Sequence, residues 1–195
     1  VEVDRQHPDG YYQNWNTSIG YELSPRDVVE VRYVGARGSG LDTSMVNWNS
    51  PDPDPNATDI QSRRPYPQFA KIRMWAHDGS STYRSLQAQY KRSVASQSIT
   101  VAYTLGQNRD NQAEGLNNNR SRRQNPRGGV DSEWADSVAD IRHRLVVGWV
   151  WDLPFGSNLT GLSGLLVKGW QVSGIGTFQS GSPLFITQDG DVLNT

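Results

Sequence analysis

The chain has 195 residues, a net charge of −1 and a hydrophobic fraction of 35%. Globular domains usually reach about 45–50% on a count that includes glycine. The mixed charges exclude a global field that would recruit nucleic acid, and the absence of cysteine excludes disulfides and thiolate metal sites. Nineteen Gly, 7 Trp and 8 Tyr fit a membrane barrel with a polar lumen and aromatic girdles, and also a soluble β-sandwich with long loops.

The first two expected elements form a hairpin of long strands. Over residues 11–23, apolar and polar side chains alternate with a period of two, which indicates a strand. Ser24-Pro-Arg-Asp27 predicts a tight turn, because proline favours the start of one. Residues 28–38 then alternate again, so we expect Glu30 and Arg32 on the face opposite the valines.

A long loop and a second hairpin are expected next. Residues 39–67 are rich in proline and have no periodicity, which predicts a loop. Residues 69–75 predict a strand too short for the ~9–11 residues that a spanning strand needs. Strands are expected over 82–92, with Gln87 and Gln89 on the polar face, and over 99–105, joined by a turn at 93–97.

The last part of the chain predicts another loop and two more strands. Residues 108–138 are rich in Asn, Arg and Gly and predict a second long loop, with a weak helix candidate at 131–139. Strands are expected over 141–153 and 169–181, joined by a turn at 154–165. Counting strands then places the three short turns at one end of the sheet and both long loops at the other. Outer-membrane barrels show this asymmetry.

Five motifs in sequence order carry a resemblance to a known family. They resemble the barrel of TonB-dependent outer-membrane receptors, most closely the Oar-like type with a carboxypeptidase-regulatory-like domain. The motifs are Tyr66-Pro-Gln-Phe69, Tyr83-Arg-Ser-Leu-Gln87, Ala102-Tyr-Thr104, Asp140-Ile-Arg-His-Arg-Leu145 with Leu153-Pro-Phe-Gly156, and Gly169-Trp-Gln-Val-Ser-Gly174 with Gln179-Ser-Gly-Ser-Pro183.

The resemblance implies energised uptake of a scarce ligand (siderophore, oligosaccharide or peptide) across a bacterial outer membrane. The implied partners are the outer-membrane lipid, the small ligand and the TonB complex acting through a plug domain. We find no plug, TonB box, signal peptide or closing strand in residues 1–195, so we expect a partial barrel segment. No cofactor is implied. Polar side chains facing the lumen are the candidate ligand contacts, chiefly Glu30, Arg32, Gln87, Gln89, Arg142 and Arg144, with Asn14, Asn16 and Gln171 beside them.

Other chemistries have weaker support in the sequence. The histidines, including His143, lack carboxylates at ligand spacing, so no metal site is predicted. Asp52, Asp54 and Asp59 lack the glycine and terminal glutamate of an EF-hand loop, and a solvated loop is the preferred interpretation. Basic residues between 120 and 127 have no interleaved aromatics, so nucleic-acid stacking is unsupported. No serine or carboxylate pattern identifies a catalytic residue, and an enzyme is not the favoured interpretation.

The sequence therefore predicts an all-β fold, a long antiparallel meander from a transmembrane β-barrel. The main alternative is a soluble β-sandwich or jelly roll acting as a carbohydrate-binding module or small hydrolase, and a filament-forming protein is a third. A barrel predicts that one row of residues faces lipid, whereas a sandwich packs the same row into a closed core. That row is Ile19, Val31, Tyr103, Val147 and Trp149.

Overall fold

The structure, a computed structural model, describes residues 9–111, 130–156 and 158–184. Most of the described residues belong to long strands. The elements are β1 (Tyr11–Ser24), β2 (Asp27–Asn47), β3 (Arg73–Val94), β4 (Gln97–Asp110), the short 3-10 helix η1 (Val130–Glu133), β5 (Ala135–Asp136), β6 (His143–Asp152), α1 (Gly161–Val167) and β7 (Gln171–Gln179). No helix in these ranges is long and apolar enough to cross a membrane.

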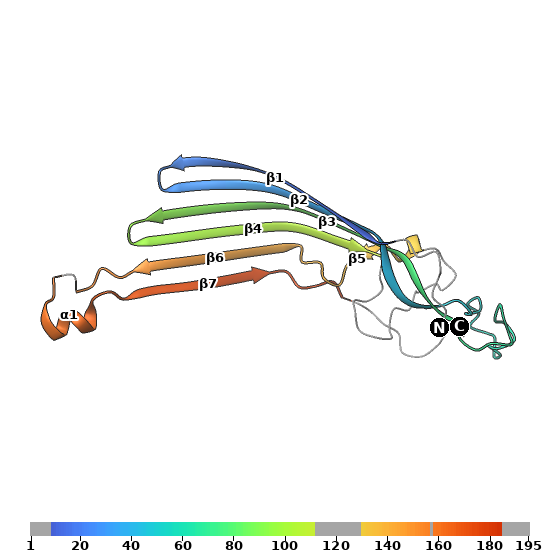
Figure 1. The fold of residues 1–195 in the computed structure, drawn as a ribbon. Helices are drawn as coiled ribbons and strands as arrows, with labels where there is room; N and C mark the ends of the chain where they lie inside the picture. Colours follow the sequence, from blue (N-terminus) through green and yellow to red (C-terminus); the bar gives the residue numbers. More distant parts are fainter. Residues whose placement is uncertain (1–8, 112–129, 157, 185–195) are drawn as a thin grey trace.

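The strands form one antiparallel sheet in the order β1-β2-β3-β4-β6-β7, with the two-residue β5 pairing beside β4. Figure 1 shows this sheet as a single layer, in which β1 and β7 are the two edges. Each strand pairs with its neighbour in sequence, apart from the small β5. This is the predicted meander, and it is confirmed.

The connections divide between the two ends of the sheet as the strand count predicts. The tight turns after β1 and β3 and the β6–β7 connection carrying α1 lie at one end (Figure 1). The long β2–β3 loop, η1 and β5 lie at the other end (Figure 1). Most of the second predicted loop, residues 112–129, lies outside the described residues.

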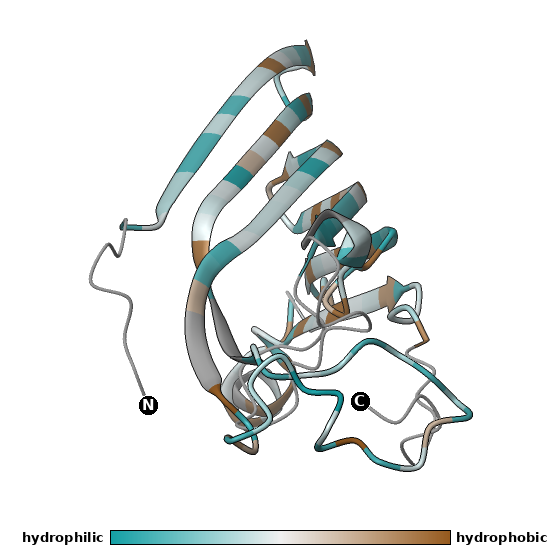
Figure 2. Ribbon diagram, turned by 90° about the vertical axis from the view of Figure 1, so that its right-hand side faces the viewer, coloured by the Kyte–Doolittle hydropathy of each residue, from teal (hydrophilic) through white to brown (hydrophobic). Residues whose placement is uncertain are grey.

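The pairing register gives the sheet two chemically distinct faces. Directly paired residues share a face, and Ile19 pairs with Val31, Val31 with Ala88, and Ala88 with Tyr103. The same face continues through β6 and β7. Its further members include Trp15, Tyr21, Val29, Tyr33, Leu86, Val101, Leu105, Leu145, Val147, Trp149, Trp151, Val172 and Phe178. We call this the apolar face. Figure 2 shows the alternation as brown and teal bands along the strands.

The apolar face is exposed rather than packed. Ile19 is 78% exposed and Phe178 65%, and few apolar side chains of the described residues are buried, among them Ala36 in β2 and Pro51 in the β2–β3 loop. No second sheet covers these side chains, because all described strands belong to one sheet. The sandwich alternative is therefore wrong for this part of the chain. A sheet with an exposed apolar face requires a nonaqueous neighbour, and lipid supplies one.

Three expectations about the elements are corrected. Residues 69–75 do not form a separate strand, since residues 73–75 begin the 22-residue β3. Residues 39–47 are not part of the loop expected over 39–67, because they continue β2 and pair with β3, as Leu41 does with Gly79. The helix candidate at 131–139 is mostly wrong, since only η1 forms there and β5 follows it. The connection at 154–165 contains the start of α1, which the sequence did not predict.

Two indoles on the apolar face lie against glycines of the neighbouring strand. A methyl group added at Gly35 of β2 would lie 2.3 Å from the ring of Trp15 in β1. A methyl group at Gly174 of β7 would lie 2.3 Å from the ring of Trp149 in β6. Each glycine therefore leaves the space that lets an aromatic ring cover the backbone of the next strand.

Candidate functional site on the polar face

A row of polar side chains crosses the face opposite the apolar one. Arg32 of β2 pairs with Ser18 of β1 and with Gln87 of β3. Gln87 pairs with Thr104 of β4, and Thr104 with Arg144 of β6. The adjacent row contains Glu30 paired with Gln89. Strand pairing thus brings residues far apart in sequence into one continuous polar surface, which we call the polar face.

Four of the predicted ligand contacts surround one shallow depression on the polar face. Glu30, Arg32, Gln87 and Gln89 line a volume of about 150 Å³, together with residues of β4. Arg32 donates to Glu30, with Nη2 2.7 Å from Oε1, and the two side chains are 46% and 29% exposed. The depression therefore offers an ion pair and two amides, which can bind neutral polar groups as well as charged ones.

The other two of the six chief candidates, Arg142 and Arg144, do not line this depression. Arg144 is on the same polar row but two strands away from Gln87. Arg142 precedes β6, and its Nη2 lies 3.9 Å from Oδ2 of Asp136 beside β4. The structure therefore brings together Glu30, Arg32, Gln87 and Gln89, with Arg144 in the same row, and leaves Arg142 apart from them.

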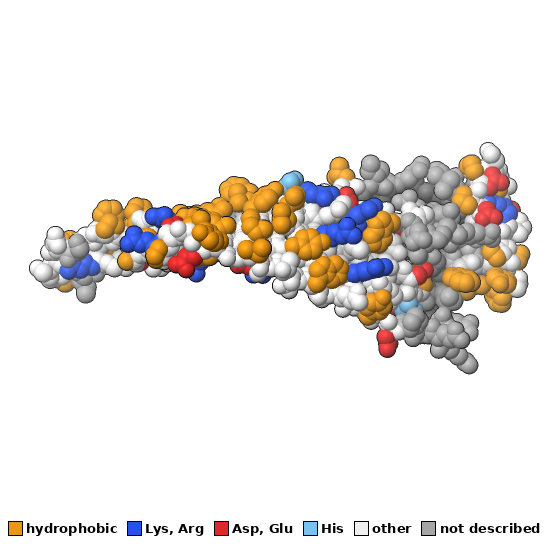
Figure 3. Space-filling view, turned by 90° about the horizontal axis from the view of Figure 1, so that it is seen from above, with side chains coloured by type: hydrophobic (Ala, Val, Ile, Leu, Met, Phe, Trp, Pro, Cys, Tyr) orange, Lys and Arg blue, Asp and Glu red, His pale blue; other side chains and the backbone are white. Residues whose placement is uncertain are grey.

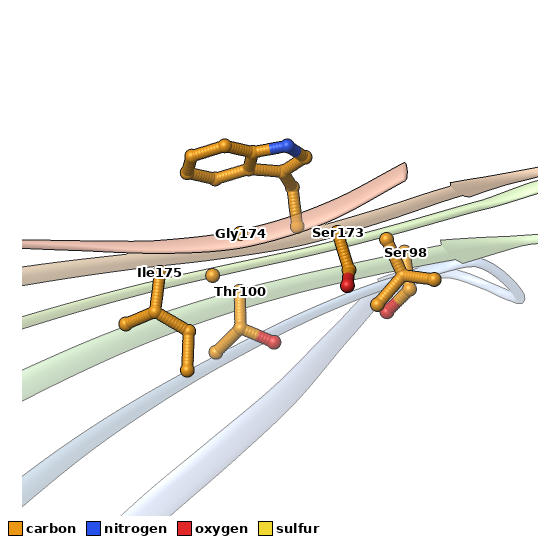
Figure 4. A pocket seen from close by; sticks show the side chains of 8 residues that line it. Ser98, Thr100, Ser173, Gly174 and Ile175 are labelled. Atoms are coloured by element: carbon orange, nitrogen blue, oxygen red, sulfur yellow. The ribbon is translucent and has the colours of Figure 1, made fainter. Parts of the chain in front are cut away.

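A wider depression of about 620 Å³ lies on the polar face towards the short-turn end. Figure 4 shows the side chains of Ser98, Thr100, Ser173 and Ile175 projecting from the same side of the sheet around it. Its floor includes Gly148 of β6, where an added methyl group would meet no atom within 4 Å. Sequence reasoning missed this feature because it depends on the mutual register of β4, β6 and β7. The alternation of small and apolar residues within each strand was the available signal.

The β2–β3 loop has a built interior centred on Asn49. The Asn49 side chain has no exposed surface and donates to the carbonyls of Tyr66, Phe69 and Ala70 at 3.0, 2.8 and 2.8 Å. Its Oδ1 accepts from the Tyr66 amide at 2.9 Å, and Nη1 of Arg64 donates to the Asn49 carbonyl. The Asn49 side chain, near the start of the loop, is thus hydrogen-bonded to residues 66–70 near its end. Sequence reasoning did not identify Asn49.

The loop aspartates form turns. Oδ1 of Asp59 accepts from the amides of Gln61 and Ser62 at 2.9 and 3.3 Å. Hydrogen bonds from the Ser62 side chain, then from the backbone amides, hold the pKa of Asp59 below its ordinary value. In the described part of the chain, no group of three His, Asp or Glu residues is arranged to hold a metal ion. His143 stacks on Tyr103, with Nδ1 2.7 Å from the tyrosine hydroxyl.

Comparison with known proteins assigns the family. Residues 1–195 match a family model described as an outer membrane beta barrel domain. The chain therefore belongs to the outer-membrane β-barrel family, and its location is the bacterial outer membrane. No curated protein and no solved structure matches it. The apolar face is accordingly the lipid-facing surface, and the polar face is the one that turns towards the barrel interior.

Proposed function

We propose that this chain is part of the wall of a TonB-dependent receptor that takes up a scarce ligand across the outer membrane. The observation that carries the proposal is the polar face, on which Glu30, Arg32, Gln87 and Gln89 converge from β2 and β3 around one depression. Polar groups at this position contact a solute in the lumen without competing with lipid. The resemblance of five sequence motifs to TonB-dependent receptors is the reason for proposing uptake driven by TonB.

The open edges of the sheet support a larger barrel. Among the described strands, β1 and β7 each pair on one side only, so each presents a row of backbone groups that no other described strand pairs with. Unpaired backbone groups are costly in lipid, and spanning sheets therefore close on themselves. Additional strands must meet β1 and β7 in the assembled protein. Because outer-membrane barrels have short periplasmic turns and longer extracellular loops, the β2–β3 loop lies outside the cell.

The ligand is expected to meet the β2–β3 loop before it reaches the lumen. Trp48, Tyr66 and Phe69 are exposed, and each is adjacent to Asn49 or hydrogen-bonded to it through its backbone. The Asn49 network therefore fixes the backbone of three aromatic residues at the outer mouth. Rigid aromatic side chains bind at low cost in conformational entropy.

Energy coupling tests the proposal. The whole protein is expected to be retained by an immobilised periplasmic domain of TonB. In cells it is expected to accumulate a labelled ferric siderophore, oligosaccharide or oligopeptide only while TonB is present. Glu30→Gln with Arg32→Gln is expected to reduce accumulation with normal barrel assembly, whereas Arg26→Gln with Lys168→Gln at the short-turn end should not. TonB-independent accumulation would identify a passive pore instead, and absence of TonB retention would contradict the receptor assignment.

A further inference from the structure

Three arginines interrupt the lipid-facing surface at its loop-side border, whereas Arg92 at the opposite border pairs with Asp27 at 3.0 Å. Arg37 of β2, Arg84 of β3 and Arg109 of β4 all belong to the face that carries Ile19 and Leu86. They lie towards the long-loop end: Arg84 is in the row of Trp15, and Arg37 and Arg109 are in the next row towards the loops. Figure 3 shows basic side chains gathered beside the apolar belt on the side of the loops. We call Arg37, Arg84 and Arg109 the arginine border.

The register places the three side chains close together. Arg37 and Arg109 are both paired with Thr82, one from each side, and Arg84 is two residues along β3 from Thr82. Neighbouring strands are about 4.8 Å apart, so the three Cα atoms lie within roughly 10 Å of one another. Guanidinium groups on this spacing can converge on one phosphate or bridge two. The Thr82 hydroxyl adds a neutral donor between them.

Positive charge at the arginine border is only partly neutralised by its neighbours. Arg37 and Arg84 are exposed, and no carboxylate of a described residue lies within ion-pair distance of either. Arg109 shares a single carboxylate, that of Asp136, with Arg142 at 3.5 and 3.9 Å. The single Asp136 carboxylate thus serves two guanidinium groups and does not balance the charge of Arg37 and Arg84. Arg109 is also held in place by the Trp134 ring, 5.6 Å from its Cζ.

A basic cluster pointing into lipid needs an anionic partner at the same depth. The border lies at the loop-side limit of the apolar belt, at the height of the outer-leaflet headgroups when the long loops are extracellular. The outer leaflet carries lipopolysaccharide, a glycolipid with phosphates at this level. We propose that the arginine border binds the phosphate groups of lipopolysaccharide, so that Arg37, Arg84 and Arg109 seat this lipid against the outside of the barrel. The proposal uses the membrane orientation above and does not depend on transport.

Lipid retention by the whole protein tests this site. The protein, purified in detergent, is mixed with lipopolysaccharide and with the same lipid after removal of its phosphates, and bound lipid is measured. A basic residue near an anionic lipid surface is worth about fivefold in binding, so combined Arg37→Gln, Arg84→Gln and Arg109→Gln should weaken retention on the order of 100-fold. Removing the lipid phosphates should have a comparable effect on the unsubstituted protein.

The matched control removes three positive charges at the opposite end of the strands, by Arg26→Gln, Lys91→Gln and Lys168→Gln. It should retain lipopolysaccharide as the unsubstituted protein does. Equal loss in both triple variants, no loss in the arginine-border variant, or full displacement by inorganic phosphate would each overturn the proposal. If the triple variant does not assemble, Arg37→Gln and Arg84→Gln separately should each weaken retention about fivefold, and unchanged retention in both would also overturn it.

Discussion

Asn49 is the single residue on which the order of the outward loop depends most. Its buried amide serves the carbonyls of Tyr66, Phe69 and Ala70, so truncation leaves several buried backbone groups without partners. Each such group costs about 1–3 kcal/mol. Asn49→Ala is therefore expected to open the loop locally and to increase protease cleavage within residues 48–72 by at least about tenfold. Asn56→Ala, at an exposed position of the same loop, is the control. Equal cleavage of the two variants would contradict the role of Asn49.

The glycines under the indoles give a second prediction about single residues. Gly174→Ala places a methyl group where the Trp149 ring lies, so the ring must move and the unfolding free energy should fall by about 1 kcal/mol. The same substitution at Gly148, which has open space, is expected to leave stability unchanged or slightly raised. In a Trp149→Ala background the cost of Gly174→Ala should vanish. A cost that persists there would show that the ring is not its cause.

Among the elements, β3 was predictable from the sequence in its central part but not at its start. Alternation of Leu86, Ala88 and Tyr90 with Gln87 and Gln89 predicted the strand and its two faces from local pattern alone. Asp78-Gly79 has the composition of a turn, yet the residues from 73 onwards join β3 because the matching part of β2 pairs with them through three register shifts. Such pairing is a long-range property that local composition does not contain.

The candidate site likewise has one part that the sequence predicts and another that it does not. Placement of Glu30, Arg32, Gln87 and Gln89 on one face follows from a period of two, and was predictable. The wider depression around Gly148 and the Asn49 network were not, because each depends on contacts between segments distant in sequence. Helix α1 was missed because Gly161 and Gly164 are poor helix formers, so its leucines were assigned to a turn.

The β2–β3 hairpin extends past the apolar belt, and its amide hydrogen exchange should change along its length. Paired amides in the regular ladder, such as those between residues 28–39 and 80–91, should exchange slowly with solvent deuterium. Beyond Ser39 the register shifts repeatedly, and exchange is expected to accelerate there, with protection still above that of the exposed loop. Exchange beyond Ser39 as fast as in residues 52–60 would mean that the hairpin ends at the membrane.

For the molecule as a whole, the open sheet predicts the behaviour of these 195 residues in isolation. The sheet formed by residues 9–111, 130–156 and 158–184 presents an apolar face and two strand edges that no described residue covers or pairs with. Both features promote association in water. Expressed without detergent, the chain should aggregate, and detergent or the completing strands should relieve this. Size-exclusion chromatography with light scattering checks it, and a clean soluble monomer of 21.8 kDa would contradict a lipid-facing sheet.

The most direct test of a lipid face and a lumen face is a cysteine scan along β3. Single cysteines at positions 86 to 90 of the whole protein in membranes, on a background without other cysteines, would be treated with a water-soluble thiol reagent and then with a lipid-dissolved one. We expect positions 87 and 89 to react with the first, and 86, 88 and 90 with the second, because alternate side chains face opposite sides. Uniform reactivity along the strand, or the opposite alternation, would contradict the assignment of the two faces.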